Sequence, residues 1–419
     1  MFKKRDGFLK ISEDKKRLVS NFFSLSALQG INLVLPLITL QYLVRVLGVE
    51  NYGLINFVVS IIMYFNILIS FGFELSATRE ISIHREDNKK ISEIFSAVMI
   101  IKTIMLLFSL VTLSMLVLFI DSFKAHALLY YATFGIVIGD SIFPSWFFQG
   151  MERMKYITYI NVFSKSLFAV LIFVFIKEKT DYIYVPLLNS AGSIIGGVYA
   201  LWLVFKLFPI QFVIPSKEII YTQLKDSFRF FLSRIANNGS RYFATTIIGL
   251  YFGNLLVGYY SMVEKLFYAF MSIGSIISQT IYPYMSRTRN IQFFKKIFIF
   301  IVGLSILLLL PIICFNEEIL FLVFGVRDAI LSKIFIIVFS AAIFSIASAL
   351  LGYPLLAALG HIKYANNSLI YASFIYVGYT SLVVIFTQNI YLVSSAISIY
   401  MALGFLFRVY YVRKTKILF

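Results

Sequence analysis

The sequence predicts an all-α integral membrane protein whose chain crosses the bilayer about twelve times. Of the 419 residues, 60% are hydrophobic and only 14% are charged, and the mean hydropathy is +0.88. A soluble domain of this size has too small an interior to hide that much apolar side chain. Stretches such as 92–120 and 330–358 also exceed the roughly 20 apolar residues that span a bilayer as a helix. Helices are expected rather than a barrel, because the sequence lacks short alternating segments.

The individual spans follow from the apolar stretches and the short connections between them. We place them at residues 22–47, 53–74, 92–120, 126–149, 156–176, 183–208, 228–252, 255–285, 296–315, 330–358, 364–386 and 390–411. Residues 1–20 are too polar for a cleavable signal, so the first span is expected to be an uncleaved anchor.

The net charge of +17 reports orientation rather than a nucleic-acid partner, because of where the charges lie. The two tails and the connections on the same side of the membrane hold 26 Lys and Arg residues. Arg408 is counted with the C-terminal tail. The connections on the other side hold four: Lys124, Lys177, Lys179 and Arg327. This asymmetry follows the positive-inside rule, so both termini are expected in the cytoplasm.

Two matched segments indicate that the chain is an internal repeat. Gly48–Gly53 and Gly253–Gly258 recur at an offset of 205, each between two spans. A second pair recurs at an offset of 210, Pro144 with Gly150 and Pro354 with Gly360. Each pair lies where the fourth span of its half of the chain ends. Caps and kinks alone would explain single glycines and prolines, whereas aligned pairs favour two six-helix lobes related by a pseudo-two-fold axis along the membrane normal.

The repeat divides the chain into two lobes with a polar connection between them. We expect a cytoplasmic basic tail at 1–20, an N-terminal lobe at 21–208, an interlobe linker at 209–225, a C-terminal lobe at 226–411 and a cytoplasmic tail at 412–419. In duplicated transporters of this plan the substrate path lies between the lobes.

Ionisable residues inside the spans are the best site candidates, because a charge in the bilayer is costly unless it meets a partner or water. Lys102, Asp140 and Lys165 each lie about ten residues into their spans, at a shared depth of about 15 Å, so they are expected to meet. Lys102 and Asp140 form either a structural ion pair or part of a coupling site. Glu264 beside Lys265 is a second pair open to the same two interpretations.

The span at 228–252 carries a stripe of polar residues. Arg234, Asn238, Arg241 and Thr245 follow at i, i+4, i+7 and i+11, which predicts one helical face. Arg234 is near the cytoplasmic end and could instead extend to the interface, whereas Arg241 lies mid-span and requires a wet cavity or an anion. Further polar candidates within spans are Gln29, Asn32 and Asn161.

The balance of these charges predicts the kind of substrate. Five cations, Lys102, Lys165, Arg234, Arg241 and Lys265, face two carboxylates, Asp140 and Glu264. A cavity with that surplus favours an anion, and a guanidinium can hold phosphate oxygens in a bidentate manner.

Several segments resemble the polysaccharide-type flippases of the multidrug/oligosaccharidyl-lipid/polysaccharide exporter superfamily, in particular the O-antigen repeat-unit translocases. The resemblance runs from about residue 20 to 411. The segments are Gly48-Val-Glu-Asn-Tyr-Gly53, Phe71-Gly-Phe-Glu-Leu-Ser-Ala-Thr-Arg-Glu-Ile81, Trp146-Phe-Phe-Gln-Gly-Met-Glu-Arg-Met-Lys-Tyr156, Val257-Gly-Tyr-Tyr260 and Gln279-Thr-Ile-Tyr-Pro-Tyr-Met-Ser286.

The resemblance implies a V-shaped transporter in a bacterial plasma membrane that moves an undecaprenyl-diphosphate-linked oligosaccharide from the inner to the outer leaflet. On this reading Arg234, Arg241 and Lys165 bind the diphosphate. Gln29, Asn32, Asn161 and Asn238 face sugars or water. The resemblance also implies coupling to H⁺ or Na⁺, with Asp140 or Glu264 as the titrating group, and a polysaccharide polymerase and chain-length machinery as candidate partners.

Three alternatives stay open at this point. An exporter of organic cations shares the twelve-span plan but should carry unpaired carboxylates in its cavity. A polysaccharide polymerase or membrane glycosyltransferase needs a sizeable loop for its catalytic groups, and a channel needs a filter motif; neither is found in the sequence. No cofactor or metal is expected, since His84, His126 and His361 are scattered and Cys314 is the only cysteine.

Overall fold

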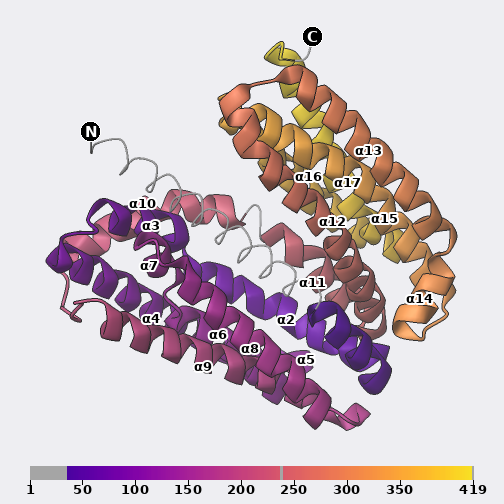
Figure 1. Cartoon of the computed structure of the whole chain (residues 1–419). Coiled ribbons are helices and arrows are strands. Elements are labelled where there is room, and N and C mark those ends of the chain that lie inside the picture. The colour runs from indigo at the N-terminus through magenta and orange to yellow at the C-terminus, as the bar shows by residue number, and fades with distance from the viewer. Residues whose placement is uncertain (1–34, 236–238, 418–419) are drawn as a thin grey trace, which may run out of the picture.

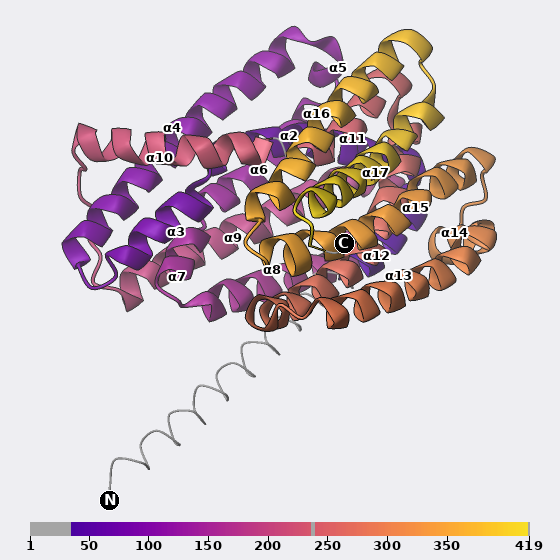
Figure 2. The same cartoon turned by 90° about the horizontal axis from the view of Figure 1, so that it is seen from above.

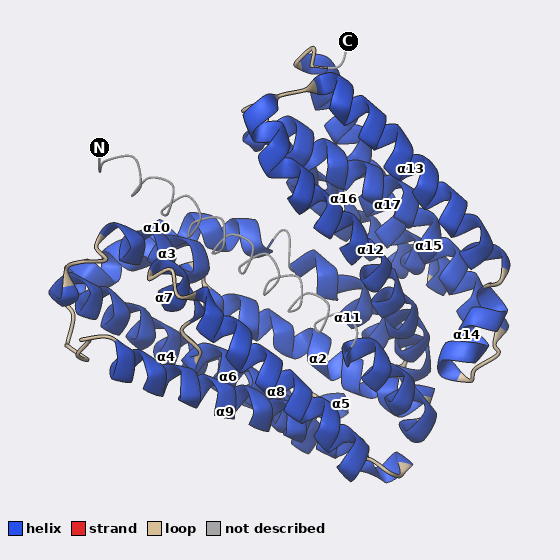
Figure 3. Ribbon diagram, viewed as in Figure 1, coloured by secondary structure: helices blue, strands red, loops and turns tan. Residues whose placement is uncertain are grey.

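The computed structural model describes residues 35–235 and 239–417, and every regular element in those ranges is helical (Figure 3). Within these ranges nine helical segments are long and apolar enough to cross a membrane. The predicted all-α membrane class is confirmed. A shorter apolar helix at Leu35–Leu47 and the helices between residues 217 and 288 occupy the other predicted spans.

The helices form the two arms of a V (Figure 1). One arm contains α2 to α9, the other contains α11 to α17, and the arms diverge toward the end where the C-terminus lies. The bounds in the first arm are α2 Val49–Ser70, α3 Phe73–Ile83, α4 Asn88–Phe119, α5 Asp121–Lys124, α6 Ala127–Ile142, α7 Ser145–Gly150, α8 Met154–Phe175 and α9 Tyr184–Leu207. The rest are α10 Lys217–Arg234, α11 Ser240–Phe252, α12 Asn254–Thr288, α13 Ile291–Cys314, α14 Asn316–Phe324, α15 Ala329–Leu350, α16 Ile362–Thr387 and α17 Ile390–Lys414.

Helix α10 lies across the open end of the first arm (Figures 1 and 2). Residues 209–216 are non-helical, and Ser216 caps α10 by accepting a hydrogen bond from the Ile219 N–H. Ile220 and Leu224 then pack against buried side chains of α3 and α4. The first turns of α10 therefore occupy the second half of the segment predicted as the linker.

Three predicted spans are interrupted where the sequence analysis placed continuous helices, and a fourth changes its helix type at its end. Gly72, with a φ of +80°, separates α2 from α3, because a left-handed residue cannot continue an α-helix. Pro144 has no N–H to donate, and it separates α6 from α7. The span at 228–252 is divided between α10 and α11. The span at 330–358, which is the repeat counterpart of the span at 126–149, ends in a π-helical turn, Leu351–Ala357, that contains Pro354.

The two arms meet where α2 crosses α12, at the pair of segments that form the repeat (Figure 1). Gly48 and Gly253 cap these helices with φ values of +81° and +84°. A Cβ at Gly53 would overlap the backbone oxygen of Asn254, and a Cβ at Gly258 would overlap that of Val49. The contact is reciprocal at the same offset of 205, so the repeat forms the vertex of the V.

A further bond holds the arms together near the vertex. The Arg45 guanidinium donates to the Leu322 carbonyl of α14 over 2.8 Å. Arg45 belongs to the helix Leu35–Leu47, whose end directly precedes Gly48, so the bond fastens the same end of the V.

Alanine at the vertex glycines should destabilise the protein. Gly53→Ala or Gly258→Ala inserts a methyl group into a helix crossing with no free space, and such overpacking costs about 1–3 kcal/mol. The melting temperature of the purified protein should fall. Gly303→Ala in α13 is the matched control, because its Cβ meets nothing within 4 Å and a helical alanine gains up to about 1 kcal/mol over glycine. Equal melting temperatures for all three variants would contradict this packing.

Candidate functional site

A cavity of about 340 Å³ lies between the arms next to the vertex. Side chains from both arms line it, from the helix Leu35–Leu47 and from α2, α8, α9, α11 and α12. Its charged lining residues are Lys165, Arg241, Lys265 and Glu264. Three cations and one carboxylate leave the described lining with a surplus of two positive charges.

Arg241 reaches this cavity from the first turn of α11. Its guanidinium lies over the ring of Tyr268 on α12, 4.4 Å from the ring centroid, and its side chain is exposed. A cation over an aromatic face is stabilised electrostatically and keeps its full charge. The Arg241 guanidinium is therefore held in place without being neutralised by that contact.

Lys265 is held in a similar way, by an aromatic residue of the other arm. Its Nζ donates to the Tyr52 hydroxyl oxygen over 2.6 Å and lies 4.9 Å from the centroid of that ring. Tyr52 is part of the repeat segment, between Gly48 and Gly53. The vertex thus brings a side chain of α2 against a cation of α12.

Glu264 is the carboxylate of the cavity lining. Its Oε2 accepts a hydrogen bond of 3.4 Å from the Thr245 hydroxyl, and its buried Oε1 has no hydrogen-bond partner in the described ranges. The predicted pairing of Glu264 with Lys265 is not observed as a contact within 4 Å, since Lys265 bonds to Tyr52 instead. Glu264 offsets part of the positive charge from the same wall.

Arg234 does not line the central cavity and is paired with a carboxylate, unlike Arg241. It ends α10 and forms a 2.6 Å ion pair with Glu74 of α3, with side-chain exposures of 23% and 43%. Of the predicted stripe, Arg241 and Thr245 line the central cavity and Arg234 does not. Asn238, like Gln29 and Asn32, lies outside the described residues.

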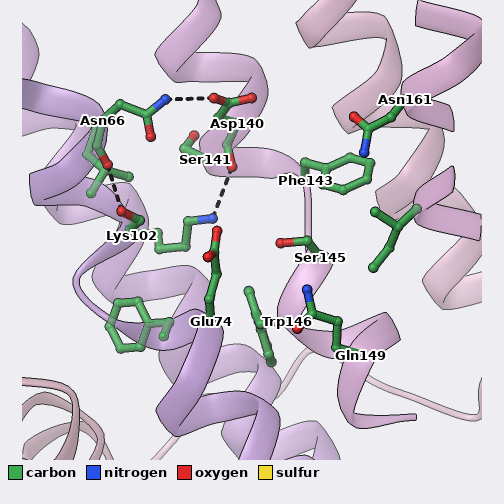
Figure 4. Close-up of a pocket in the computed structure, with 14 residues that line it drawn as sticks. Asn66, Glu74, Lys102, Asp140, Ser141, Phe143, Ser145, Trp146, Gln149 and Asn161 are labelled. Carbon is green, nitrogen blue, oxygen red and sulfur yellow. Dashed lines mark hydrogen bonds between the residues drawn. The ribbon is translucent and has the colours of Figure 1, made fainter. Parts of the chain in front are cut away.

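The first arm encloses a second cavity, of about 280 Å³ (Figure 4). Lys102 and Asp140 meet here, but not through their charges: the Lys102 ammonium donates to the backbone carbonyl of Asp140 over 3.1 Å. The Asp140 carboxylate instead accepts a 2.6 Å hydrogen bond from the Asn66 amide. Glu74 and the predicted polar residue Asn161 also line this cavity, which we call the N-arm cavity.

A smaller pocket of about 140 Å³ lies between the two cavities. It shares Asp140, Phe143 and Asn161 with the N-arm cavity. It shares Lys165, Phe168 and Asn189 with the central cavity. Asp140 and Lys165 thus line a common pocket, which lies next to both cavities and shares lining residues with each of them.

Arg408 corrects the charge count of the sequence analysis. It lies inside α17 and is 5% exposed rather than part of a cytoplasmic tail. Its guanidinium donates to the Ser368 hydroxyl, the Ser348 hydroxyl and carbonyl, and the Ala365 carbonyl. Because these oxygens satisfy its donors, the buried charge needs no carboxylate. The sequence did offer one indication that Arg408 is buried: it lies within the predicted span at 390–411 rather than after it.

The sequence analysis also missed the partners of the charged residues. Two of these partners, Tyr52 and Glu74, come from helices remote in sequence from the cations they contact. The third, Tyr268, comes from the helix that follows the one carrying Arg241. Tyr52 and Glu74 stand inside the segments that carry the family resemblance, and that was the only signal available. In the described ranges no cluster of three or more His, Cys, Asp or Glu side chains could hold a metal ion.

The sequence matches known proteins along much of its length. The family model described as "Polysaccharide biosynthesis protein" matches residues 18–289. A "Putative O-antigen transporter" of Escherichia coli (strain K12) is 30% identical over 278 residues, which are 66% of this chain and 67% of the relative. A protein of the same description from Shigella dysenteriae is 25% identical over 288 residues, 68% of this chain and 72% of the relative.

Two solved structures share the fold. The lipid II flippase MurJ in an inward closed conformation aligns with a TM-score of 0.73 at 14% identity, over 94% of this chain and 87% of that one. An inward-facing multidrug resistance transporter of the MATE family aligns with a TM-score of 0.66 at 15% identity, over 91% and 94%. At these identities the likeness concerns the fold alone.

The charge of the central cavity can be tested with thiol reagents in a Cys314→Ala background. Val59→Cys lines the central cavity and Ser145→Cys lines the N-arm cavity, where Glu74 and Asp140 outnumber Lys102. An anionic methanethiosulfonate should modify Val59→Cys several-fold faster than a cationic one, because the lining attracts anions. At Ser145→Cys this preference should vanish or reverse. Faster reaction of the cationic reagent at Val59→Cys would contradict the described electrostatics.

Proposed function

Because the chain belongs to the polysaccharide biosynthesis protein family, whose relatives include O-antigen transporters, we propose that it is a flippase for lipid-linked oligosaccharide. It is a multi-pass membrane protein of a transporter family rather than an enzyme. Its proposed substrate is an undecaprenyl-diphosphate-linked repeat unit, which moves from the cytoplasmic to the outer leaflet of the bacterial plasma membrane.

The observation that carries the proposal is the convergence of Lys165, Arg241 and Lys265 on one cavity between the arms. They come from three different helices, and the fold holds them together inside a membrane protein, where a group of like charges is costly. An anionic headgroup would balance their charge. A diphosphate supplies that charge together with the oxygens that guanidinium and ammonium groups bind.

In this proposal Arg241 and Lys165 bind the diphosphate in the central cavity, and Lys265 adds to the field. Arg234, at the end of α10, belongs to the same proposed set, and it can bind diphosphate only when its pair with Glu74 opens. Asn161, which lines the N-arm cavity, faces the sugars or water, and the family resemblance is the basis for proposing the same role for Gln29, Asn32 and Asn238, which lie outside the described residues. The isoprenoid tail stays in lipid while the headgroup crosses.

The cycle we propose is alternating access of the two arms about the vertex. The open end of the V carries the C-terminus, and the predicted cytoplasmic placement of both termini makes this an inward-facing state (Figure 1). Asp140 and Glu264 are the carboxylates available for coupling to H⁺ or Na⁺. A polysaccharide polymerase and chain-length machinery would receive the product.

Export of organic cations is disfavoured by the same cavity. A cationic drug would have to enter a lining in which three cations face one carboxylate, and like charges repel it. The likeness to a multidrug transporter is one of fold alone, at 15% identity.

Arg241→Ala should abolish surface polysaccharide in cells that depend on this transporter, with the protein still present in the membrane. Losing charged hydrogen bonds to the headgroup should cost about 1.5–3 kcal/mol, or roughly tenfold to a hundredfold in affinity. Arg241→Lys should retain part of the activity, and Arg287→Ala, at an exposed end of α12, is the matched control. Immunoblots of polysaccharide and of membrane fractions measure both. Unchanged polysaccharide in Arg241→Ala would remove this residue from the site.

A further inference from the structure

The N-arm cavity differs in chemistry from the central cavity. Its lining includes the carboxylates of Glu74 and Asp140 and one cation, Lys102, which is 5% exposed and bonded to the Asp140 carbonyl (Figure 4). The amides of Asn66, Asn161 and Gln149 also line it. A diphosphate would meet the Asp140 carboxylate here, together with a Glu74 carboxylate that is paired with Arg234. The cavity is therefore polar without being suited to the anionic end of the substrate.

Aromatic side chains complete its lining. Phe73, Phe143 and Trp146 stand beside the amides and hydroxyls; Phe143 is half-buried and offers apolar surface, whereas Phe73 is 1% exposed. Trp146 is 1% exposed, and its indole N–H has no hydrogen-bond partner in the part of the chain that the structure describes. A buried donor without an acceptor is costly, so a ligand oxygen would satisfy it.

This combination suits an uncharged sugar. A sugar ring has apolar faces that pack on aromatic side chains, and hydroxyls that both donate and accept hydrogen bonds. Amide groups can meet a hydroxyl in either role, and carboxylate oxygens accept from it. The volume of about 280 Å³ lies just below the roughly 300 Å³ at which small-molecule sites begin, so it fits a sugar unit rather than a whole repeat.

The cavity is less suited to a small coupling cation. The Lys102 ammonium already occupies the Asp140 carbonyl, Asn66 already donates to the Asp140 carboxylate, and Arg234 already pairs with the Glu74 carboxylate. Each of these contacts uses one acceptor of the set, and the Lys102 ammonium beside Asp140 repels a second cation. The remaining volume far exceeds what an ion of that size would fill.

The smaller pocket shows how the N-arm cavity lies relative to the central cavity. It shares Asp140 and Asn161 with the N-arm cavity, and Lys165 and Asn189 with the central cavity. We propose that the N-arm cavity is the glycan-recognition subsite, where an uncharged sugar of the repeat unit binds while the diphosphate lies at Arg241 and Lys165. This inference rests on the proposed function and adds where the glycan is recognised.

Trp146 provides a direct test, because the chain has two tryptophans and Trp202 lies on the exposed face of α9. In purified Trp202→Phe protein, emission comes from Trp146 alone. We would titrate it with undecaprenyl diphosphate and with the same lipid carrying a neutral oligosaccharide. Both should bind, and only the sugar-bearing lipid should shift the emission of Trp146.

Variants separate the two ends of the ligand. Gln149→Ala should weaken binding of the sugar-bearing lipid about threefold to tenfold, the usual effect of losing neutral hydrogen bonds, and leave the sugar-free lipid unchanged. Gln292→Ala, exposed at the start of α13, is the matched control and should change neither. Arg241→Ala should weaken both lipids.

The outcomes distinguish failure of this inference from failure of the proposed function. Equal emission shifts with both lipids, or binding of the sugar-bearing lipid with no shift of Trp146, would overturn the glycan subsite and leave the diphosphate site intact. Equal weakening of both lipids by Gln149→Ala would also overturn it. Binding of neither lipid, or binding unaffected by Arg241→Ala, would instead remove the diphosphate site and with it the basis of the inference.

Discussion

The close crossing of α2 and α12 is the contact on which the rest of the molecule depends. Gly53 and Gly258 let each backbone approach the first turn of the other helix, with no space for a Cβ at either position. Gly249 of α11 similarly admits the Phe57 ring of α2. Because the crossing fixes where α11 and α12 stand against the first arm, it also fixes where Arg241 and Lys265 stand relative to Lys165. One pseudo-symmetric contact therefore shapes both the V and the cavity beside its vertex.

The structure holds its charged residues in three different ways, and the difference has functional meaning. Arg234 is neutralised by Glu74, and Arg408 keeps its charge but is 5% exposed with its donors bonded to serine oxygens and carbonyls, so neither is open to a ligand in this state. Arg241 and Lys265 instead rest on tyrosines, which orient a cation without cancelling it. With Glu264 as the sole carboxylate among the described lining residues, the cavity keeps a positive field in a region where such a field is costly. A site prepared in this way fits the headgroup of a lipid-linked anion.

The spans were predictable because hydropathy reports directly on the bilayer: 183–208 corresponds to Tyr184–Leu207, and 364–386 to Ile362–Thr387. The repeat was also visible, since left-handed caps and backbone crossings require glycine. The helix breaks at Gly72 and Pro144 were not predicted, because hydropathy is averaged over a whole span and does not respond to a single residue within it. The partners of cations stayed hidden for another reason. Whether Lys102 meets the carbonyl or the carboxylate of Asp140, or Lys265 meets Glu264 or Tyr52, is decided by tertiary packing that no spacing in the sequence encodes.

The central claim is that the cavity between the arms carries the anionic headgroup of a lipid-linked glycan. Its most direct test is flux in vesicles reconstituted with the purified protein. The account predicts protein-dependent movement of a labelled undecaprenyl-diphosphate oligosaccharide between the leaflets, inhibited by a short-chain prenyl diphosphate and not by an organic cation. Accumulation of a cationic dye by the same vesicles, with the lipid-linked glycan remaining in its original leaflet, would contradict it.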